Sequence, residues 1–400
     1  MDWAAWVWRS NRDNIVNIIA SDIKGNQERY VHAERFTQET YPIPVTYRLK
    51  GPLDNSRLAE VIDRIVENTP VLMTRFATSE KGIAAHYAAT RPRLEVEELP
   101  AGMTEDEIYA LVQTTVFQKP EDLTAHEMVR LKLYRIGPDD ALLLLSLHHA
   151  VSDGMSMGLL AQQIEAGYNG QDIDAGRDFY AVTADQDPSE ASRSYWNEHL
   201  AGQEQPPKMP EDIALSREAS DPRPVIVPLD RAHLERVAQA WNVTQFSAFA
   251  TLSQAVFARA VGAEKMALSF QSAGRRSIPN SARSIGPFSN ALILTAALAP
   301  DTPLAVLASE QQRRIREAVR HEDYPYQSVV RDTGLQPSFG INWFPAAAPI
   351  HLTGLAPAHR TLVDTRTNYD IDFPSSRVRP RWSWSPITDP TCSAGPVSNM

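Results

Sequence analysis

Apolar residues in the first part of the chain recur at spacings that predict a strand followed by an amphipathic helix. Residues 45–49 form a short strand-like run, and apolar residues within 58–65 then recur at helical spacing. Asp54 or Asn55, just before them, is suited to cap the first turn of that helix. We therefore expect a strand and then a helix in this region.

A β-hairpin is predicted further along the chain. Apolar and polar residues alternate over 129–134, a turn follows at 137–140, and residues 141–147 are almost continuously apolar. A continuous apolar strand is typical of burial on both faces. Residues 155–168 then show helical spacing and end at Asn169-Gly170. The segment from His148 to Gly154 is therefore predicted to form a strand-to-helix turn.

The second half repeats this mixture of elements. We expect helices at 231–240, 244–261 and 304–320 and a strand at 266–271. The proline-rich stretches at 206–224 and 345–357 are predicted surface loops. An α/β (α+β) architecture in two halves follows, with an N-terminal subdomain at 1–170, a crossover linker at 171–190, a C-terminal subdomain at 191–373 and an irregular tail at 374–400.

Composition and charge narrow the classes of function. The chain has 400 residues, 43% of them apolar and 22% charged, which suits a soluble enzyme with two cores. The net charge of −10 repels nucleic acid, and no basic tract with interleaved aromatic residues is present. The single cysteine, Cys392, excludes an intramolecular disulfide and a thiolate zinc site. We expect no nucleic-acid partner.

The sequence also favours a cytoplasmic location. No apolar run approaches the ~18 residues that span a bilayer. The Trp-rich start meets Arg9 and Arg12 too soon to form a secretory apolar region. We expect no membrane association.

The segment His148-His149-Ala150-Val151-Ser152-Asp153-Gly154 carries the candidate chemistry. Because side chains alternate in extended backbone, only one of the two histidines should face a substrate. An imidazole can accept a proton from an attacking nucleophile and return it to a leaving group, as acyl transfer requires. Asp153 can either hold the imidazole or lock the turn through an arginine. Gly154 allows a tight turn into the helix.

Two other interpretations of this segment stay open. The histidine pair can be a packed, hydrogen-bonded structural element. A metal site of His148, His149 and Asp153 is less favoured, because adjacent histidines diverge and no further ligand cluster is evident. We expect no bound metal.

The sequence at this point resembles the condensation domains of nonribosomal peptide synthetases, which carry His-His-x-x-x-Asp-Gly. Five further segments resemble those of the family and follow in family order: 67–76, 194–202, 274–275, 285–292 and 321–326. The resemblance implies two chloramphenicol-acetyltransferase-like subdomains in a V-shaped pseudo-dimer, with an active-site tunnel between them. It makes His149 the catalytic residue and pairs Asp153 with Arg275, or alternatively with Arg276.

Further candidate site residues come from the matched segments, from the expected mechanism and from helical spacing. Gly154 is a candidate oxyanion donor through its backbone N–H. The supporting residues are His148, Arg75, Ser289 and Asn290. Arg313, Arg314, Arg316 and Arg320 are candidates for docking a carrier protein, although a solvated helix face is the simpler interpretation.

Two departures from the family pattern stand out. The first family motif, Ser-x-Ala-Gln-x-Arg followed by an aromatic residue, has no clear copy, and the Trp-rich start and Phe36-Thr37-Gln38 replace it. After residue 373 the expected apolar periodicity ends, which indicates a diverged or truncated end, or a change of reading frame near residue 374. We expect residues 375–400 to be poorly ordered.

The resemblance implies an acyltransferase that forms an amide, or an ester, from a carrier-bound acyl or aminoacyl thioester. No tightly bound cofactor is implied, because the 4′-phosphopantetheine thioester, on a carrier protein or in coenzyme A, is substrate. The expected partners are an acyl or peptidyl carrier protein and a small amine or alcohol, and we expect a monomer that is either a free-standing enzyme or an excised module. The alternatives are a coenzyme A dependent O-acyltransferase, an epimerisation domain and a non-catalytic recruitment module. The sequence identifies neither the acyl group nor the nucleophile.

Overall fold

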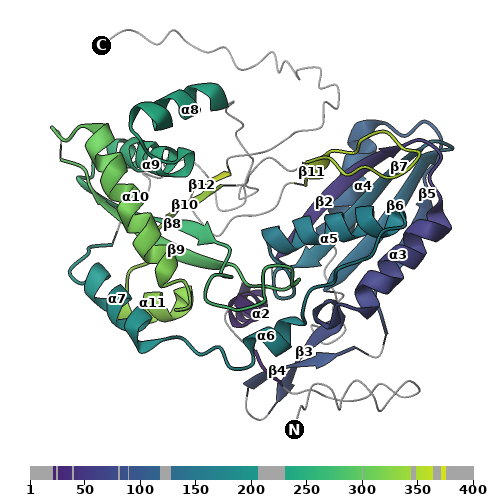
Figure 1. Cartoon of the computed structure of the whole chain (residues 1–400), viewed down its shortest axis with the longest axis horizontal. Coiled ribbons are helices and arrows are strands. Elements are labelled where there is room, and N and C mark those ends of the chain that lie inside the picture. Colours follow the sequence, from purple (N-terminus) through teal and green to yellow (C-terminus); the bar gives the residue numbers. More distant parts are fainter. Residues whose placement is uncertain are drawn as a thin grey trace.

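The fold consists of two lobes, each built on its own β-sheet (Figure 1). The computed structural model describes residues 21–23, 26–37, 40–79, 82–88, 90–117, 128–205, 230–299, 301–343, 348–363 and 371–374. Helices α2 (Asn26–Thr37) and α6 (Phe179–Thr183) lie where the two lobes meet.

The first lobe contains a five-stranded sheet in the order β11-β2-β7-β6-β5. Its strands are β2 (Pro42–Lys50), β5 (Leu94–Glu98), β6 (Val129–Gly137), β7 (Asp140–His148) and β11 (Arg360–Leu362). Its helices are α3 (Asn55–Glu67), α4 (Glu105–Phe117) and α5 (Gly154–Tyr168). A short 3₁₀ helix (Pro70–Met73) leads into a second, three-stranded sheet of β1 (Ser21–Asp22), β4 (Gly82–Tyr87) and β3 (Thr74–Ser79).

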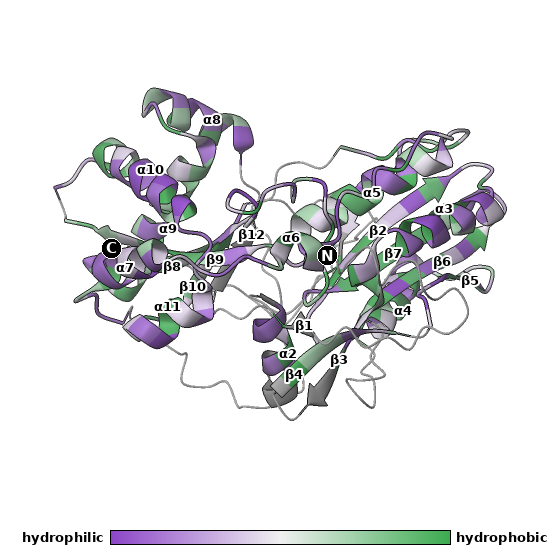
Figure 2. Cartoon of the chain, turned by 60° about the horizontal axis from the view of Figure 1, so that its bottom comes forward, coloured by the Kyte–Doolittle hydropathy of each residue, from purple (hydrophilic) through white to green (hydrophobic). Residues whose placement is uncertain are grey.

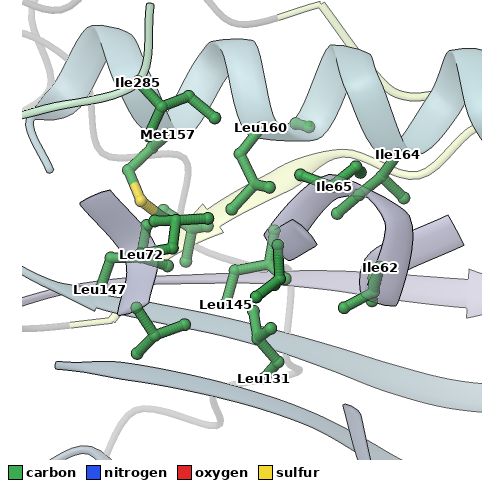
Figure 3. Packing of buried hydrophobic residues seen from close by; sticks show 14 of the residues in the cluster. Ile62, Ile65, Leu72, Leu131, Leu145, Leu147, Met157, Leu160, Ile164 and Ile285 are labelled. Carbon is green, nitrogen blue, oxygen red and sulfur yellow. The ribbon is translucent and has the colours of Figure 1, made fainter. Parts of the chain in front are cut away.

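Strand β7 is buried on both faces, as its continuous apolar sequence predicts. Leu143, Leu145 and Leu147 pack with residues of α3 and α5. Figure 3 shows this packing, with Leu145 and Leu147 beneath the apolar side chains of the two helices. The alternate residues Leu142 and Leu144 pack with the buried face of α4. This burial fixes the end of β7, where the two histidines lie.

The second lobe contains a four-stranded sheet in the order β12-β10-β8-β9. Its strands are β8 (Lys265–Ser272), β9 (Asn290–Ala297), β10 (Phe339–Asn342) and β12 (Ile371–Pro374). Its helices are α7 (Glu190–Leu200), α8 (Arg231–Ala240), α9 (Gln245–Val261), α10 (Leu304–Arg320) and α11 (Tyr326–Thr333). Strands β8 and β9 form an antiparallel pair, and their long connection over residues 273–289 reaches the first lobe.

Most elements predicted from periodicity are present. The β6–β7 hairpin forms, Asp54 caps α3, and α5 ends at the cap residue Asn169. Helices α8 and α10 span the predicted ranges. Among the described residues, no helix has the length and apolar content needed to cross a membrane.

The structure corrects two of the expected boundaries. The predicted linker at 171–190 contains α6, whose Phe179 and Val182 are buried in the core of the first lobe. Residues 348–363, predicted to belong to the C-terminal subdomain and in part to a surface loop, pack on the first lobe. Strand β11 pairs with β2, and Ile350 and Leu352 join the first-lobe core. The chain therefore returns to the first sheet before it forms β12 in the second.

Some predictions fall on parts of the chain outside the described residues. The predicted loop at 206–224, the tail at 375–400 with Cys392, and Gln38 are all among them. The V-shaped pseudo-dimer and the tunnel between the lobes stay predictions.

Candidate active site

The candidate site is the turn that joins β7 to α5. His148 is the last residue of β7, and Asp153 is the N-cap of α5. Successive side chains in extended backbone point to opposite faces, and accordingly His148 is buried whereas His149 is half-buried. The turn therefore presents only one of the two imidazoles toward the surface.

Asp153 is fixed by four hydrogen-bond donors from three parts of the chain. Its Oδ1 accepts from the N–H of Ser156 at 2.7 Å, the usual N-cap bond. Its Oδ2 accepts from Arg275 Nη1 at 2.8 Å and from the N–H groups of Phe288 and Ser289 at 3.0 Å each. Both side chains of the Asp153–Arg275 pair are almost completely buried. Asp153 therefore fastens the turn to the β8–β9 connection.

The partner is Arg275 and not the alternative, Arg276. Arg275 also donates to Ser156 Oγ at 2.9 Å and to the carbonyl of Ser284 at 3.0 Å. Arg276 instead uses its backbone N–H to bind Glu322 Oε1 at 2.8 Å. The ion pair that the sequence resemblance implies is therefore present between Asp153 and Arg275.

His149 is held differently from Asp153. Its backbone N–H donates to the carbonyl of Tyr41 at 2.9 Å, and its ring stacks on Tyr30 with 4.4 Å between centroids and 11° between planes. Its Nδ1 is buried and has no hydrogen-bond partner among the described residues. Burial, together with the charges of His148 and Arg29, lowers the pKa of His149 from 6.5 to about 3. The imidazole is therefore neutral near pH 7.

His148 has a fully occupied, buried ring. Its Nδ1 accepts the N–H of Ala150 at 3.1 Å, and its Nε2 lies 3.0 Å from Glu34 Oε2. Nε2 also accepts the backbone N–H of Tyr41 at 3.4 Å. These contacts give His148 a structural part in the turn.

Comparison with known proteins identifies the family. The family model described as Condensation domain matches residues 24–342. The chain belongs to the condensation domain family. Tyrocidine synthase 3 of Brevibacillus parabrevis is 25% identical over 325 residues, which cover 75% of this chain and 5% of that protein. This chain therefore spans a small part of the length of that relative.

Solved structures show the same fold. The first condensation domain of the calcium-dependent antibiotic synthetase, in complex with substrate analogue 2a, has a TM-score of 0.75 and 20% identity, and the match covers 89% of this chain and 87% of that one. The X-domain from teicoplanin biosynthesis has a TM-score of 0.70 and 19% identity, and covers 88% and 84%. The mixed α/β, chloramphenicol-acetyltransferase-like fold is therefore confirmed.

This condensation domain also carries part of the family motif that the sequence analysis did not find. Helix α2 contains Gln27-Glu28-Arg29-Tyr30, which matches Gln-x-Arg followed by an aromatic residue. Gln27 Nε2 donates to the carbonyl of Ala150 at 3.1 Å, so α2 lies against the histidine turn. Phe36 and Thr37 are the last residues of the same helix, so we infer that Gln27 to Tyr30, and not Phe36-Thr37-Gln38, stand at the position of this motif. The Gln-x-Arg spacing was the signal available in the sequence.

Tyr180 is a further site residue that the sequence did not indicate. It comes from α6, within the predicted linker, and its hydroxyl accepts from Gln27 Nε2 at 3.0 Å and donates to Thr74 Oγ1 at 3.1 Å. Burial raises the pKa of Tyr180 to about 12, so the hydroxyl stays protonated. This network connects α6, α2 and β3 beneath the turn.

The other predicted residues lie close to the site or support it from outside. Gly154 is the first residue of α5 and is exposed, and its N–H has no protein acceptor within the described ranges. Ser289 contributes its backbone N–H to Asp153. Asn290 donates to the carbonyls of Glu322 and Tyr324 and accepts the N–H of Tyr326 at 3.1 Å. Asn290 therefore shapes the segment that leads into α11.

Arg75, the remaining supporting residue, lies on β3 opposite His86 of β4. It is buried and donates to the carbonyl of Thr74 at 3.0 Å. After burial, its charge is the next cause that lowers the pKa of His86. Arg75 therefore belongs to the small sheet of the first lobe.

Three of the four candidate docking arginines are exposed on α10: Arg313, Arg316 and Arg320. Figure 2 shows hydrophilic residues along this helix. Arg314 turns inward instead, where it donates to Thr295 Oγ1 at 2.9 Å and pairs with Glu310. Arg320 is exposed but pairs with Glu317 at 2.9 Å, so Arg313 and Arg316 are the exposed arginines of the four for which no side-chain ion pair is described.

Proposed function

We propose that this domain forms an amide, or less favourably an ester, by attack of an amine or alcohol on an acyl or aminoacyl thioester held by 4′-phosphopantetheine. The observation that carries the proposal is the state of His149. It is a neutral, half-buried imidazole whose Nδ1 has no hydrogen-bond partner in the described part of the chain, on a turn locked by the Asp153–Arg275 pair. A neutral imidazole can accept a proton, and a fixed turn holds it in place during the reaction.

In the proposed reaction the nucleophile's nitrogen bonds to the thioester carbonyl carbon, and the C–S bond then breaks. The proton released by the nucleophile passes to His149 and from there to the departing thiolate. A pKa of about 3 makes His149 a weak base, so it orients the amine by a hydrogen bond first and takes the proton late. In this proposal the N–H of Gly154, at the start of α5, binds the tetrahedral oxyanion.

The thioester would be delivered by an acyl or peptidyl carrier protein. Arg313, Arg316 and Arg320 on α10 supply an exposed basic surface in an otherwise acidic chain. Carrier proteins are usually acidic, so opposite charge would favour encounter at this helix.

The test follows an acyl-loaded carrier protein by intact-protein mass spectrometry, with a panel of amines and either wild type or His149→Ala. His233→Ala is a matched control, because His233 is an exposed histidine on α8. We expect unloading with amide formation by wild type and by the control, and none by His149→Ala.

Each other outcome identifies a different error. If the acyl group is transferred only from coenzyme A, then coenzyme A and not a carrier protein is the donor. Carrier binding without unloading of any donor would indicate a recruitment module. Equal turnover by His149→Ala would overturn the assignment of His149.

A further inference from the structure

One face of α2 contacts the histidine turn residue by residue. Gln27 donates to the carbonyl of Ala150, Tyr30 stacks on His149, and Glu34 lies against His148. Positions 27, 30 and 34 lie on one face of a helix. A single rigid element therefore supports three consecutive residues of the turn.

Within this face, Tyr30 makes the contact that bears on the reacting group. Its ring lies nearly parallel to the His149 imidazole at 4.4 Å, and Tyr30 is 7% exposed. His149 Nδ1 has no hydrogen-bond partner among the described residues. A catalytic imidazole is usually oriented by a hydrogen bond at its second nitrogen. Here the stack replaces that hydrogen bond as the contact that sets the ring plane.

Tyr30 is in turn held from the second lobe. The Arg29 guanidinium lies 5.3 Å from the centre of the Tyr30 ring and 5.2 Å from that of Tyr326, the first residue of α11. Asn290 fixes Tyr326 by accepting its backbone N–H. Contacts of this kind between a guanidinium and an aromatic face are attractive. A continuous series of contacts thus runs from β9 and α11, through Arg29, to His149.

We propose that Tyr30 is a positioning residue for His149: it holds the plane of the imidazole, and Arg29 secures it to Tyr326 of the second lobe. The inference rests on the proposed function for its kinetic consequence, but the orientation of the ring can be measured without any substrate. Among the described residues, the groups that face His149 with charge or a titratable proton are Arg29 and Tyr30 from α2 and His148 from β7.

The experiment compares Tyr30→Leu with Tyr30→Phe, which keeps the ring and removes only the hydroxyl. In protein labelled at its 10 histidines, the His149 ring signals are assigned by their loss in His149→Ala. We expect wild type and Tyr30→Phe to show an upfield ring-current shift of these signals, and Tyr30→Leu to lose it. The pKa of His149 should rise toward 6.5 in Tyr30→Leu, because the imidazole becomes more exposed.

Kinetics give the second readout. We expect Tyr30→Leu to lower kcat about tenfold with little change in KM, and Tyr30→Phe to restore most of the loss. If Tyr30→Leu does not fold, Arg29→Met is used, and loosening of Tyr30 should weaken the ring shifts and lower kcat about threefold. The proposal would be overturned if the His149 ring shifts in Tyr30→Leu equalled those of wild type. The same holds for Arg29→Met where that variant is used. A change in KM alone would also overturn the proposal. A domain without transferase activity would still give the ring shifts, so failure of the proposed function is distinguishable.

Discussion

The two ends of the turn between β7 and α5 are held in opposite ways. At Asp153, both carboxylate oxygens are bound, by one buried guanidinium and three backbone N–H groups. At His149, Nδ1 has no partner within the described residues, and the ring is held by a stack. The two residues are only four positions apart along the chain.

The difference assigns different roles to the two residues. A buried carboxylate is stable only when it is paired and hydrogen-bonded, so the contacts of Asp153 serve the fold. A buried polar atom without a protein partner costs stability, so the Nδ1 of His149 makes no comparable contribution to the fold. We infer that Asp153 locks the turn, and we propose that His149 is the residue that takes part in proton transfer.

The largest expected effect comes from removing the carboxylate of Asp153, which holds the α5 end of the turn. Asp153→Ala leaves the buried Arg275 guanidinium unpaired and removes the acceptor of three N–H groups. We expect the free energy of unfolding to fall by about 3–5 kcal/mol in a denaturant titration. The control is Asp174→Ala, whose pair with Arg283 is exposed and should cost less than about 1 kcal/mol. Equal losses of unfolding free energy in the two variants would contradict a structural role for Asp153.

A second substitution disturbs the backbone that binds Asp153. A Cβ at Gly274, where φ is +65°, would lie 1.8 Å from the carbonyl oxygen of Phe288, next to an N–H that binds Asp153. We expect Gly274→Ala to lose more than about 3 kcal/mol. Gly262→Ala is the matched control, because φ is +69° there but no atom lies within 4 Å; it should lose about 1 kcal/mol. Similar thermal unfolding of both variants would contradict the close packing at Gly274.

The pH dependence of kcat/KM tests the state of His149. Because the pKa of His149 is lowered to about 3, its neutral form persists as the pH falls from 7.5 to 5.5, and kcat/KM should stay flat. A histidine with an ordinary pKa would lose about tenfold over this range. A weakly basic aromatic amine as acceptor keeps its own ionisation out of the profile. A fall centred near pH 6.5 would show that His149 is solvated.

The same lowered pKa affects stability. The pKa of His149 is lower in the folded state than the 6.5 of the unfolded state. The contribution of His149 to the free energy of unfolding is therefore complete above pH 6.5 and is lost as the pH falls toward 3.

The smallest expected effect concerns a similar contrast on α10, where Arg314 is engaged and Arg316 is exposed. Arg316→Glu should raise the KM for the carrier protein about threefold, with kcat unchanged and the effect reduced at high salt. Arg64→Glu, at an exposed position on α3, is the control. An equal rise in KM for both variants would place carrier docking elsewhere.

The sequence predicted the locked turn better than its surroundings. The β6–β7 hairpin and α5 have strong local periodicity, and the pairing of Asp153 with Arg275, 122 positions away, came only from the family resemblance. Helix α2 was missed because the face that meets the turn is made of Gln27, Tyr30 and Glu34, which give no apolar period. Strand β11 has three residues, too few for a pattern, so its pairing with β2 was not predictable.

The central claim is that His149 serves the reaction and Asp153 serves the fold. The most direct test measures the single-turnover rate of acyl transfer and the free energy of unfolding of His149→Ala in one preparation, beside wild type. We predict a rate loss of at least about 100-fold and a change in unfolding free energy within about 1 kcal/mol. A wild-type rate, or a stability loss as large as that of Asp153→Ala, would contradict the account.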